Sequence, residues 1–261
     1  MADVNPYAAP RSQVDDVPVA EKGNFIATGR AVPAGYAWNW IAGGWELFKK
    51  QPGTWIGLFV VWAVIFIALG MVPLLGAIAT NALFPVFGAG IIIGTRTLAQ
   101  GGKLELAHLF AGFKRNTGNL VVVGLLFLVA MFAAAIPAIA IVGIGFFKIF
   151  AGMGSPAAAF GKSLGTFALA WLIWLSLMVP VYMAIWFAPA LVALHDCGPG
   201  EALRHSFGAC LKNTMPFLVY GIVLLMLFFV GSIPVGLGLL IVIPVTMASV
   251  YTSYRDIFFG D

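Results

Sequence analysis

The feature that most constrains this chain is a series of long apolar segments that contain no acidic residue. Six of them occur, at about 55–75, 78–98, 120–144, 167–194, 217–233 and 237–254. An α-helix needs about 20 apolar residues to cross a hydrocarbon layer of about 30 Å. Charged residues make up only 9% of the chain, whereas soluble domains carry about 25%. The sequence therefore predicts an all-α polytopic membrane protein with six transmembrane helices.

A second feature is a short segment that recurs. Residues 106–124 and 204–221 match at an offset of about 97 positions, which aligns His108 with His205 and Asn116 with Asn213. A weaker third copy lies at 45–58. Each copy is an amphipathic segment with a basic end, then a polar break, then an apolar run. We predict a three-fold internal repeat of an interfacial helix plus a two-span hairpin, with units at about 36–101, 102–197 and 198–258.

Each predicted interfacial helix carries an apolar stripe at helical spacing. The stripes are Trp38, Ile41, Trp45 and Phe48 in the first, Leu106, Leu109, Phe110 and Phe113 in the second, and Leu203, Phe207, Cys210 and Leu211 in the third. His108 and His205 fall on the opposite, polar sides, so we expect solvated histidines there. Cys197 and Cys210 are placed on the cytoplasmic side, where we expect no disulfide.

The basic residues predict the orientation. Twelve of the 14 lysines and arginines lie on the side of the N-terminus, and only Lys148 and Lys162 lie opposite, in a loop expected at 148–165. The positive-inside rule then places both termini and all three amphipathic helices in the cytoplasm.

Basic residues also mark the candidate contacts with anionic lipid. They gather at the ends of the interfacial helices and of two spans: Lys49, Lys50, Lys114, Arg115, Lys212, Arg96 and Arg255. Each would attract an anionic headgroup by about 1 kcal/mol. The alternative interpretation is that these residues fix the orientation only.

All ten acidic residues lie outside the six segments. Coupled transporters and intramembrane hydrolases usually hold ionisable groups at depth, so we expect no pump and no enzyme. His195, Asp196 and Cys197 offer weak Cys/His chemistry, and the histidines lack a metal-ligand spacing. We expect no cofactor, no metal and no nucleic-acid partner.

Two further patterns lie inside the spans. Prolines at 85, 137, 180, 189 and 244 indicate a shared bend, or alternatively the helix breaks that transporters use at binding sites. The pair Gly90 and Gly94 matches a close-packing motif, which we expect to join two helices of one chain.

Residues 1–35 are polar and rich in proline, so we predict a flexible cytoplasmic tail with no cleavable signal peptide. Within it, Asn5-Pro6-Tyr7-Ala8-Ala9-Pro10 is either inert or a docking peptide for a cytoplasmic protein. Residues 36–258 would form the six-span membrane domain. The oligomeric state is left open.

Five stretches carry a resemblance: RAVPAG at 30–35, GWELF at 44–48, PLLG at 73–76, HLFAGF at 108–113 and YTSYRD at 251–256. With these the chain resembles a family of bacterial, chiefly betaproteobacterial, inner-membrane proteins of undefined activity. It is more distantly similar to the membrane domain attached to some glycerophosphoryl diester phosphodiesterases, without their catalytic domain. The resemblance implies a six-span inner-membrane domain and no reaction.

The function expected from these patterns is a non-enzymatic, lipid-interacting scaffold or adaptor, whose partners are membrane phospholipid and, through the tail, a cytoplasmic protein. The alternative is a permease or channel for a small neutral or lipidic solute. A polar cavity at mid-depth would favour that alternative, and a dry packed centre would count against it.

Overall fold

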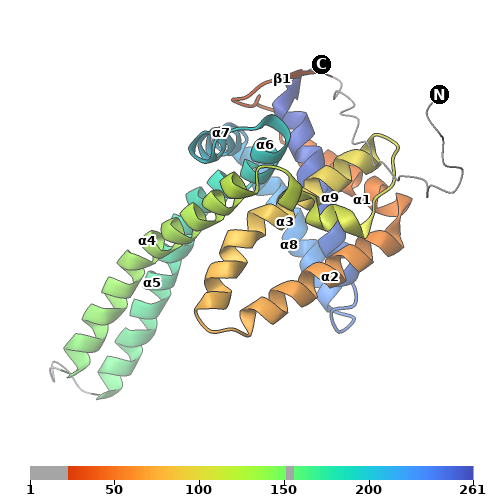
Figure 1. The fold of residues 1–261 in the computed structure, drawn as a ribbon. Coiled ribbons are helices and arrows are strands. Elements are labelled where there is room, and N and C mark those ends of the chain that lie inside the picture. Colours follow the sequence, from red (N-terminus) through yellow and green to blue (C-terminus); the bar gives the residue numbers. More distant parts are fainter. Residues whose placement is uncertain (1–22, 151–155, 261) are drawn as a thin grey trace, which may run out of the picture.

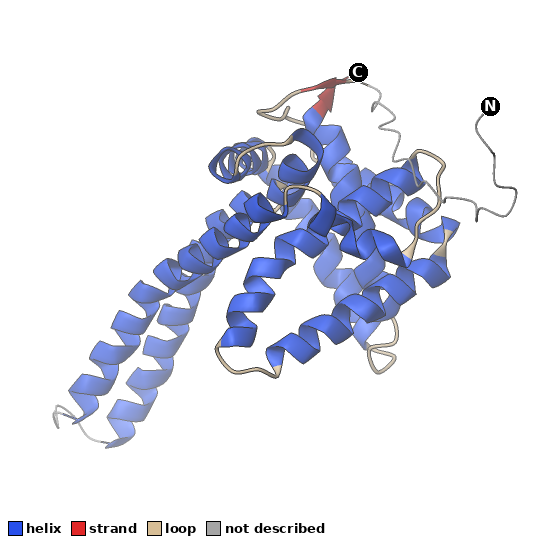
Figure 2. Ribbon diagram, viewed as in Figure 1, coloured by secondary structure: helices blue, strands red, loops and turns tan. Residues whose placement is uncertain are grey.

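The computed structural model describes residues 23–150 and 156–260. Their regular secondary structure is helical apart from one short strand pair (Figures 1 and 2). The all-α prediction is confirmed for this part of the chain. The elements, in order, are β1 (Asn24–Phe25), α1 (Tyr36–Lys50), α2 (Pro52–Gly70), α3 (Leu75–Ala99), the 3-10 helix η1 (Leu106–Lys114), α4 (Thr117–Phe150), α5 (Pro156–Ile185), α6 (Ala188–His195), α7 (Pro199–Lys212), α8 (Thr214–Ser232), α9 (Leu239–Phe258) and β2 (Phe259–Gly260).

Five segments within the described residues are helical, long and apolar enough to cross a membrane: Pro52–Gly70, Leu75–Ala99, Thr117–Ile144, Leu164–His195 and Thr214–Ser232. The sixth predicted segment forms α9, whose 20 residues would extend about 30 Å at 1.5 Å per residue. Its second half is more polar. These residues fit there because α9 packs against α1, α2, α3 and α8 rather than facing outward on all sides.

The predicted loop at 148–165 is largely wrong. α4 continues to Phe150 and α5 already begins at Pro156, because the largely apolar sequence continues through residues 146–150 and proline is favoured in the first turn of a helix. α4 therefore has 34 residues, about 51 Å at 1.5 Å per residue. The α4–α5 hairpin extends away from the other helices toward the lower left of Figure 1.

The predicted fourth span is interrupted between α5 and α6. In a continuous helix the Phe187 N–H would bond to the Met183 carbonyl, but the Ser206 hydroxyl of α7 stands between them. It accepts from Phe187 N at 3.0 Å and donates to Met183 O at 2.8 Å. Pro189, in the first turn of α6, removes a further backbone donor. An inserted side chain and a proline together account for the break.

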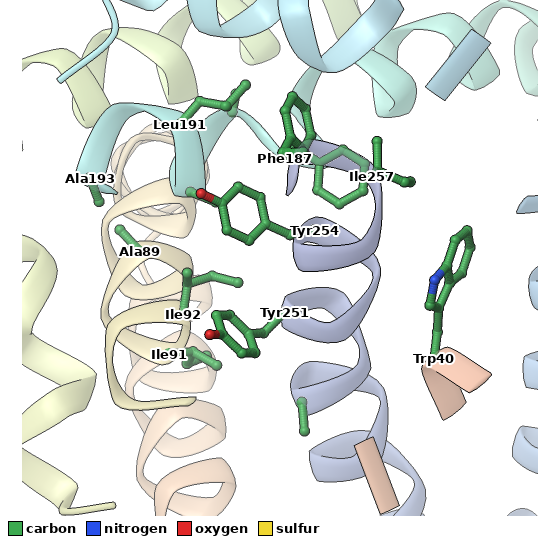
Figure 3. Packing of buried hydrophobic residues seen from close by; sticks show 14 of the residues in the cluster. Trp40, Ala89, Ile91, Ile92, Phe187, Leu191, Ala193, Tyr251, Tyr254 and Ile257 are labelled. Carbon is green, nitrogen blue, oxygen red and sulfur yellow. The ribbon is translucent and has the colours of Figure 1, made fainter. Parts of the chain in front are cut away.

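The core lies where α9 meets α3 and α6. Tyr251 and Tyr254 project from α9 toward Ile91 and Ile92 of α3 and toward Leu191 of α6 (Figure 3), and all five side chains are buried. Buried polar groups of α9 are paired inside the protein: Ser249 with the Tyr220 hydroxyl at 2.6 Å, and Thr252 with the Trp40 carbonyl at 2.8 Å. Hydrogen bonds of this kind allow a central helix to carry polar residues.

Close helix contacts pass through glycine. A Cβ added at Gly90 of α3 would lie 2.5 Å from the His108 and Leu109 carbonyl oxygens of η1, and one added at Gly94 would lie 2.8 Å from His108 Cβ. The expected packing of this pair within one chain is confirmed. Gly44 of α1 approaches α9 in the same way, since its Cβ would lie 2.6 Å from the Val245 carbonyl oxygen.

Residues 23–35, predicted as part of the flexible tail, include segments that pair with the C-terminal end of the chain. β1 pairs antiparallel with β2, with Phe25 opposite Phe259, and Arg30 N donates to Ile257 O at 2.7 Å. These pairings join residues more than 200 positions apart, so local composition gave no sign of them. Residues 1–22, which contain the Asn5–Pro10 motif, lie outside the described residues.

Candidate functional site

The first amphipathic helix, α1, buries a different face from the predicted stripe. Trp40 and Leu47 are buried together with Ile41 and Phe48, while Trp38 is 64% exposed and Trp45 is 42% exposed. The helix packs on α9 through its inner face, so part of the predicted stripe is left outside. Trp45 stacks on Phe48 with ring centroids 5.6 Å apart, next to the basic end of the helix.

The second amphipathic segment is a 3-10 helix, which changes the faces because its residues repeat every three positions. His108 was expected in solvent, but this is wrong: it is 9% exposed. Its Nδ1 accepts from Glu105 N at 2.9 Å, which caps the helix start. Phe110 and Phe113 are exposed instead.

The third amphipathic helix, α7, buries small residues, namely Ala202, Ser206 and Ala209. Leu211, predicted on its apolar face, is 58% exposed. His205 is half-buried, with Nε2 3.5 Å from Glu201. The prediction of a fully solvated histidine is therefore wrong here too.

Six of the seven candidate lipid contacts are exposed residues: Lys49, Lys50, Lys114, Arg115, Lys212 and Arg255. Lys49 pairs with Glu46 of the same helix at 2.7 Å, and Arg255 lies 3.7 Å from Asp256. The Lys114 and Arg115 side chains have no hydrogen-bond or ion-pair partner within residues 23–150 and 156–260. They follow directly after the exposed Phe113.

Two of the exposed candidates, Lys50 and Lys212, also bond to backbone carbonyls within the fold, and the seventh candidate, Arg96, is less exposed. Lys50 Nζ donates to the Leu98 carbonyl at 3.3 Å, which places a cation at the carboxyl end of α3, where the helix dipole favours it. Lys212 Nζ donates to the Thr28 and Gly29 carbonyls at 3.1 Å each. Arg96 is half-buried near the end of α3.

His195 and Asp196 contact different partners. His195 stacks on Phe25 with centroids 3.5 Å apart and bonds to the Tyr254 hydroxyl, while Asp196 accepts from Asn116. Burial raises the pKa of the Cys197 thiol, and Glu201 and Asp196 raise it further, which keeps the thiol in its unreactive protonated form. Among the described residues, no three His, Cys, Asp or Glu side chains gather to hold a metal ion.

A set of contacts that sequence reasoning missed occurs at the polar break after each amphipathic helix. The amide side chain there bonds to backbone in the segment that precedes another amphipathic helix. Gln51 Oε1 accepts from Leu104 N at 2.8 Å, Asn116 Nδ2 donates to Val192 O at 3.3 Å, and Asn213 Oδ1 accepts from Val32 N at 2.8 Å. An amide residue at the same place in each sequence copy was the available signal.

The membrane-depth interior contains an apolar cavity of about 220 Å³ between α2, α3, α5, α6 and α9. Ile91, Trp186, Pro189 and Val250 are among the residues that line it. Trp186, in the break between α5 and α6, has a buried indole N–H with no hydrogen-bond partner among the described residues. No pattern in the sequence pointed to this residue.

These features define the class of protein. Five apolar segments long enough to span a bilayer contain no aspartate or glutamate, and three amphipathic helices adjoin them, each of which ends in an exposed lysine. This is a multi-pass integral membrane protein.

The comparisons identify the family. The chain is 33% identical over 233 residues to a protein of Burkholderia thailandensis named "Probable inner membrane protein", and the alignment covers 84% of this chain and 82% of that relative. The chain belongs to this family of inner-membrane proteins. No protein-family model matches the chain, and no solved structure matches it. The expected inner-membrane family is thereby confirmed, and the distant similarity to phosphodiesterase membrane domains stays a prediction.

Proposed function

We propose that this inner-membrane protein is a non-enzymatic, lipid-interacting scaffold or adaptor. The observation that carries the proposal is that exposed aromatic and exposed cationic side chains occur side by side at the ends of two amphipathic helices. In η1, Phe113 adjoins Lys114 and Arg115; in α1, Trp45 adjoins Lys49. Aromatic rings favour the headgroup layer, and cations favour anionic lipid.

We also propose six spans, with both termini in the cytoplasm. α9 supports the sixth span because 20 helical residues match a hydrocarbon thickness of about 30 Å. Figure 1 is consistent with this arrangement, since the α2–α3 and α8–α9 turns lie at the lower end and α7 and the β1–β2 pair lie at the upper end. The tail before residue 23 would then be free to meet a cytoplasmic protein.

The three-fold repeat is part of the same proposal. Its support is a cyclic pattern of contacts: α3 packs on η1, α5 packs on α7, and α9 packs on α1. The second span of each unit thus meets the amphipathic helix of the next, and the third unit returns to the first. The amide side chains of Gln51, Asn116 and Asn213 follow the same cycle. A closed ring of this kind would hold the three amphipathic helices at one level of the membrane.

Native mass spectrometry tests the lipid proposal. Protein released from nanodiscs of phosphatidylethanolamine and phosphatidylglycerol in equal parts is compared with the Lys114→Gln/Arg115→Gln variant. The matched control, Lys148→Gln/Lys162→Gln, removes the same charge from the predicted opposite side. We expect retained phosphatidylglycerol to fall only in the first variant. Equal retention in all three proteins would contradict the proposal.

A second candidate function, passage of a lipidic solute, is favoured by the cavity between α2, α3, α5, α6 and α9. Its lining is apolar, so it suits neither an ion nor a polar solute. A flux assay of fluorescent phospholipid between the leaflets of proteoliposomes tests this function. Transfer no faster than in protein-free vesicles would exclude it.

A further inference from the structure

The cavity between α2, α3, α5, α6 and α9 runs inward from an open side. Phe84 of α3 and Tyr182 of α5 are 46% and 53% exposed, whereas Ile92 and Ala190, at its inner end, are 4% and 1% exposed. Phe84 and Tyr182 both belong to helices long enough to span the membrane. The opening between them therefore faces the hydrocarbon region, and the molecules that reach it from there are lipids.

The depth of the opening suits the end of an acyl chain. Counting along α3 at 1.5 Å per residue, Ile92 lies about 6 Å from the Arg96 end of the span and Phe84 about 18 Å from it. The opening is thus near the middle of the bilayer, where the ends of acyl chains lie. This placement rests on the proposed orientation.

The second spans of all three proposed units contribute to the lining. Ile91 and Val250 each lie six positions after the proline of their helix, Pro85 in α3 and Pro244 in α9, and Trp186 lies six positions after Pro180. Proline bends a helix and frees space beside it. Each second span therefore carries a proline six positions before a residue that lines the cavity.

The size and chemistry of the cavity restrict its occupant. A volume of about 220 Å³ exceeds the cavity of about 150 Å³ that holds one benzene molecule, yet it is small for a complete phospholipid. An apolar lining does not hold water stably.

We propose that this cavity binds the end of one acyl chain of a membrane lipid, which enters between Phe84 and Tyr182. The site deepens the proposed lipid interaction, because it adds a specific chain site to the headgroup contacts at Lys114 and Arg115. It is separate from those contacts in the structure, so the two can be tested in different variants.

The test uses phosphatidylglycerol with a photoreactive diazirine on one acyl chain, in nanodiscs that otherwise contain phosphatidylethanolamine. After illumination, labelled peptides are mapped by mass spectrometry. We expect label enriched in α3 and α5 around Gly88 and Trp186. A second cavity shares Tyr182 and Trp186 with this one and is also lined by Phe217 and Leu218 of α8. Label spread evenly over all exposed spans, or found on α8 around Phe217 and Leu218 without label on α3 around Gly88, would overturn the proposal.

Cavity-filling variants sharpen the test. A Cβ at Gly88 would meet only Pro189, at 3.7 Å, so Gly88→Leu places its side chain in the cavity without a backbone clash. The matched control is Gly221→Leu, on the exposed surface of α8, where a Cβ meets nothing within 4 Å. We expect a drop on the order of tenfold in α3 and α5 label for Gly88→Leu and none for Gly221→Leu, which corresponds to about 1.4 kcal/mol of binding.

One further variant keeps the result decisive. If Gly88→Leu does not fold, Met247→Trp fills the same cavity from α9, and we expect the same loss of label. Failure of the headgroup proposal would appear as unchanged phosphatidylglycerol retention in Lys114→Gln/Arg115→Gln, while the labelling of α3 and α5 stays intact. Failure of the chain site would appear as unchanged labelling in Gly88→Leu.

Discussion

Replacing Asn213 by alanine should release the N-terminal segment from the rest of the protein. The fully buried Asn213 side chain makes three hydrogen bonds: from Val32 N at 2.8 Å, to Arg30 O at 2.8 Å and to Ala209 O at 2.9 Å. Each is worth about 1 kcal/mol net, and Val32 N–H would be left buried without a partner, so we expect a loss of about 3 kcal/mol.

Hydrogen exchange measured by mass spectrometry in nanodiscs checks this prediction locally. A loss of about 3 kcal/mol should accelerate exchange in residues 24–32 on the order of a hundredfold, provided that the segment opens as a unit. The β1–β2 pairing and the Arg30 N to Ile257 O bond should open with it. Exchange in α3 and α4 should not change.

The control is Asn119→Ala, which changes the same residue type at a position with no side-chain hydrogen bond among the described residues. It should alter stability by less than about 0.5 kcal/mol. Unchanged exchange of residues 24–32 in Asn213→Ala would refute the role assigned to this side chain. Equal acceleration throughout the protein would refute the claim that the contact is local.

Three other predictions concern packing and thiol chemistry. Gly90→Ala should lower stability by about 2 kcal/mol, because its Cβ would lie 2.5 Å from two carbonyl oxygens of η1. The control Gly118→Ala, which has open space around it, should be neutral or stabilising, and thermal unfolding in detergent compares the two variants. Ser206→Ala should cost about 2 kcal/mol, because it strands Phe187 N–H and a carbonyl at the α5–α6 break; an unchanged melting temperature would contradict this. The pKa of Cys197 is raised, so its alkylation rate should still rise with pH where the rate of a free cysteine, with a pKa of about 8.5, has become constant. An alkylation rate that becomes constant at the same pH as that of a free thiol would contradict this prediction.

The helices were predictable because their signals are local. Apolar runs located five spans and α9, and the polar breaks at Gln51, Asn116 and Asn213 marked the ends of all three amphipathic segments. Each signal depends on residues within one or two turns, where hydrophobic periodicity and turn chemistry operate.

What could not be predicted depends on distant partners. His108 looked solvated on an α-helical wheel, but the segment is a 3-10 helix packed against Gly90 and Gly94. The break after Ile185 depends on a serine hydroxyl supplied by α7, 21 positions later. Phe25 stacks on His195, although no residue near either of them in the sequence predicts this contact. For the candidate site, the positions of the basic residues were predictable. Which of them would bond to other parts of the chain was not, and Lys212, which donates to the Thr28 carbonyl, is an example.

The measurement that tests the central claim most directly is the membrane depth of the three amphipathic helices. Spin labels are placed at the exposed positions Trp45, Phe110 and Leu211, in a background in which Cys197 and Cys210 are replaced. Their accessibility to oxygen and to a water-soluble relaxation agent is then measured in lipid bilayers. We predict that all three labels lie at headgroup depth on the same side of the membrane. A label in bulk water, in the hydrocarbon centre or on the opposite side would contradict the account.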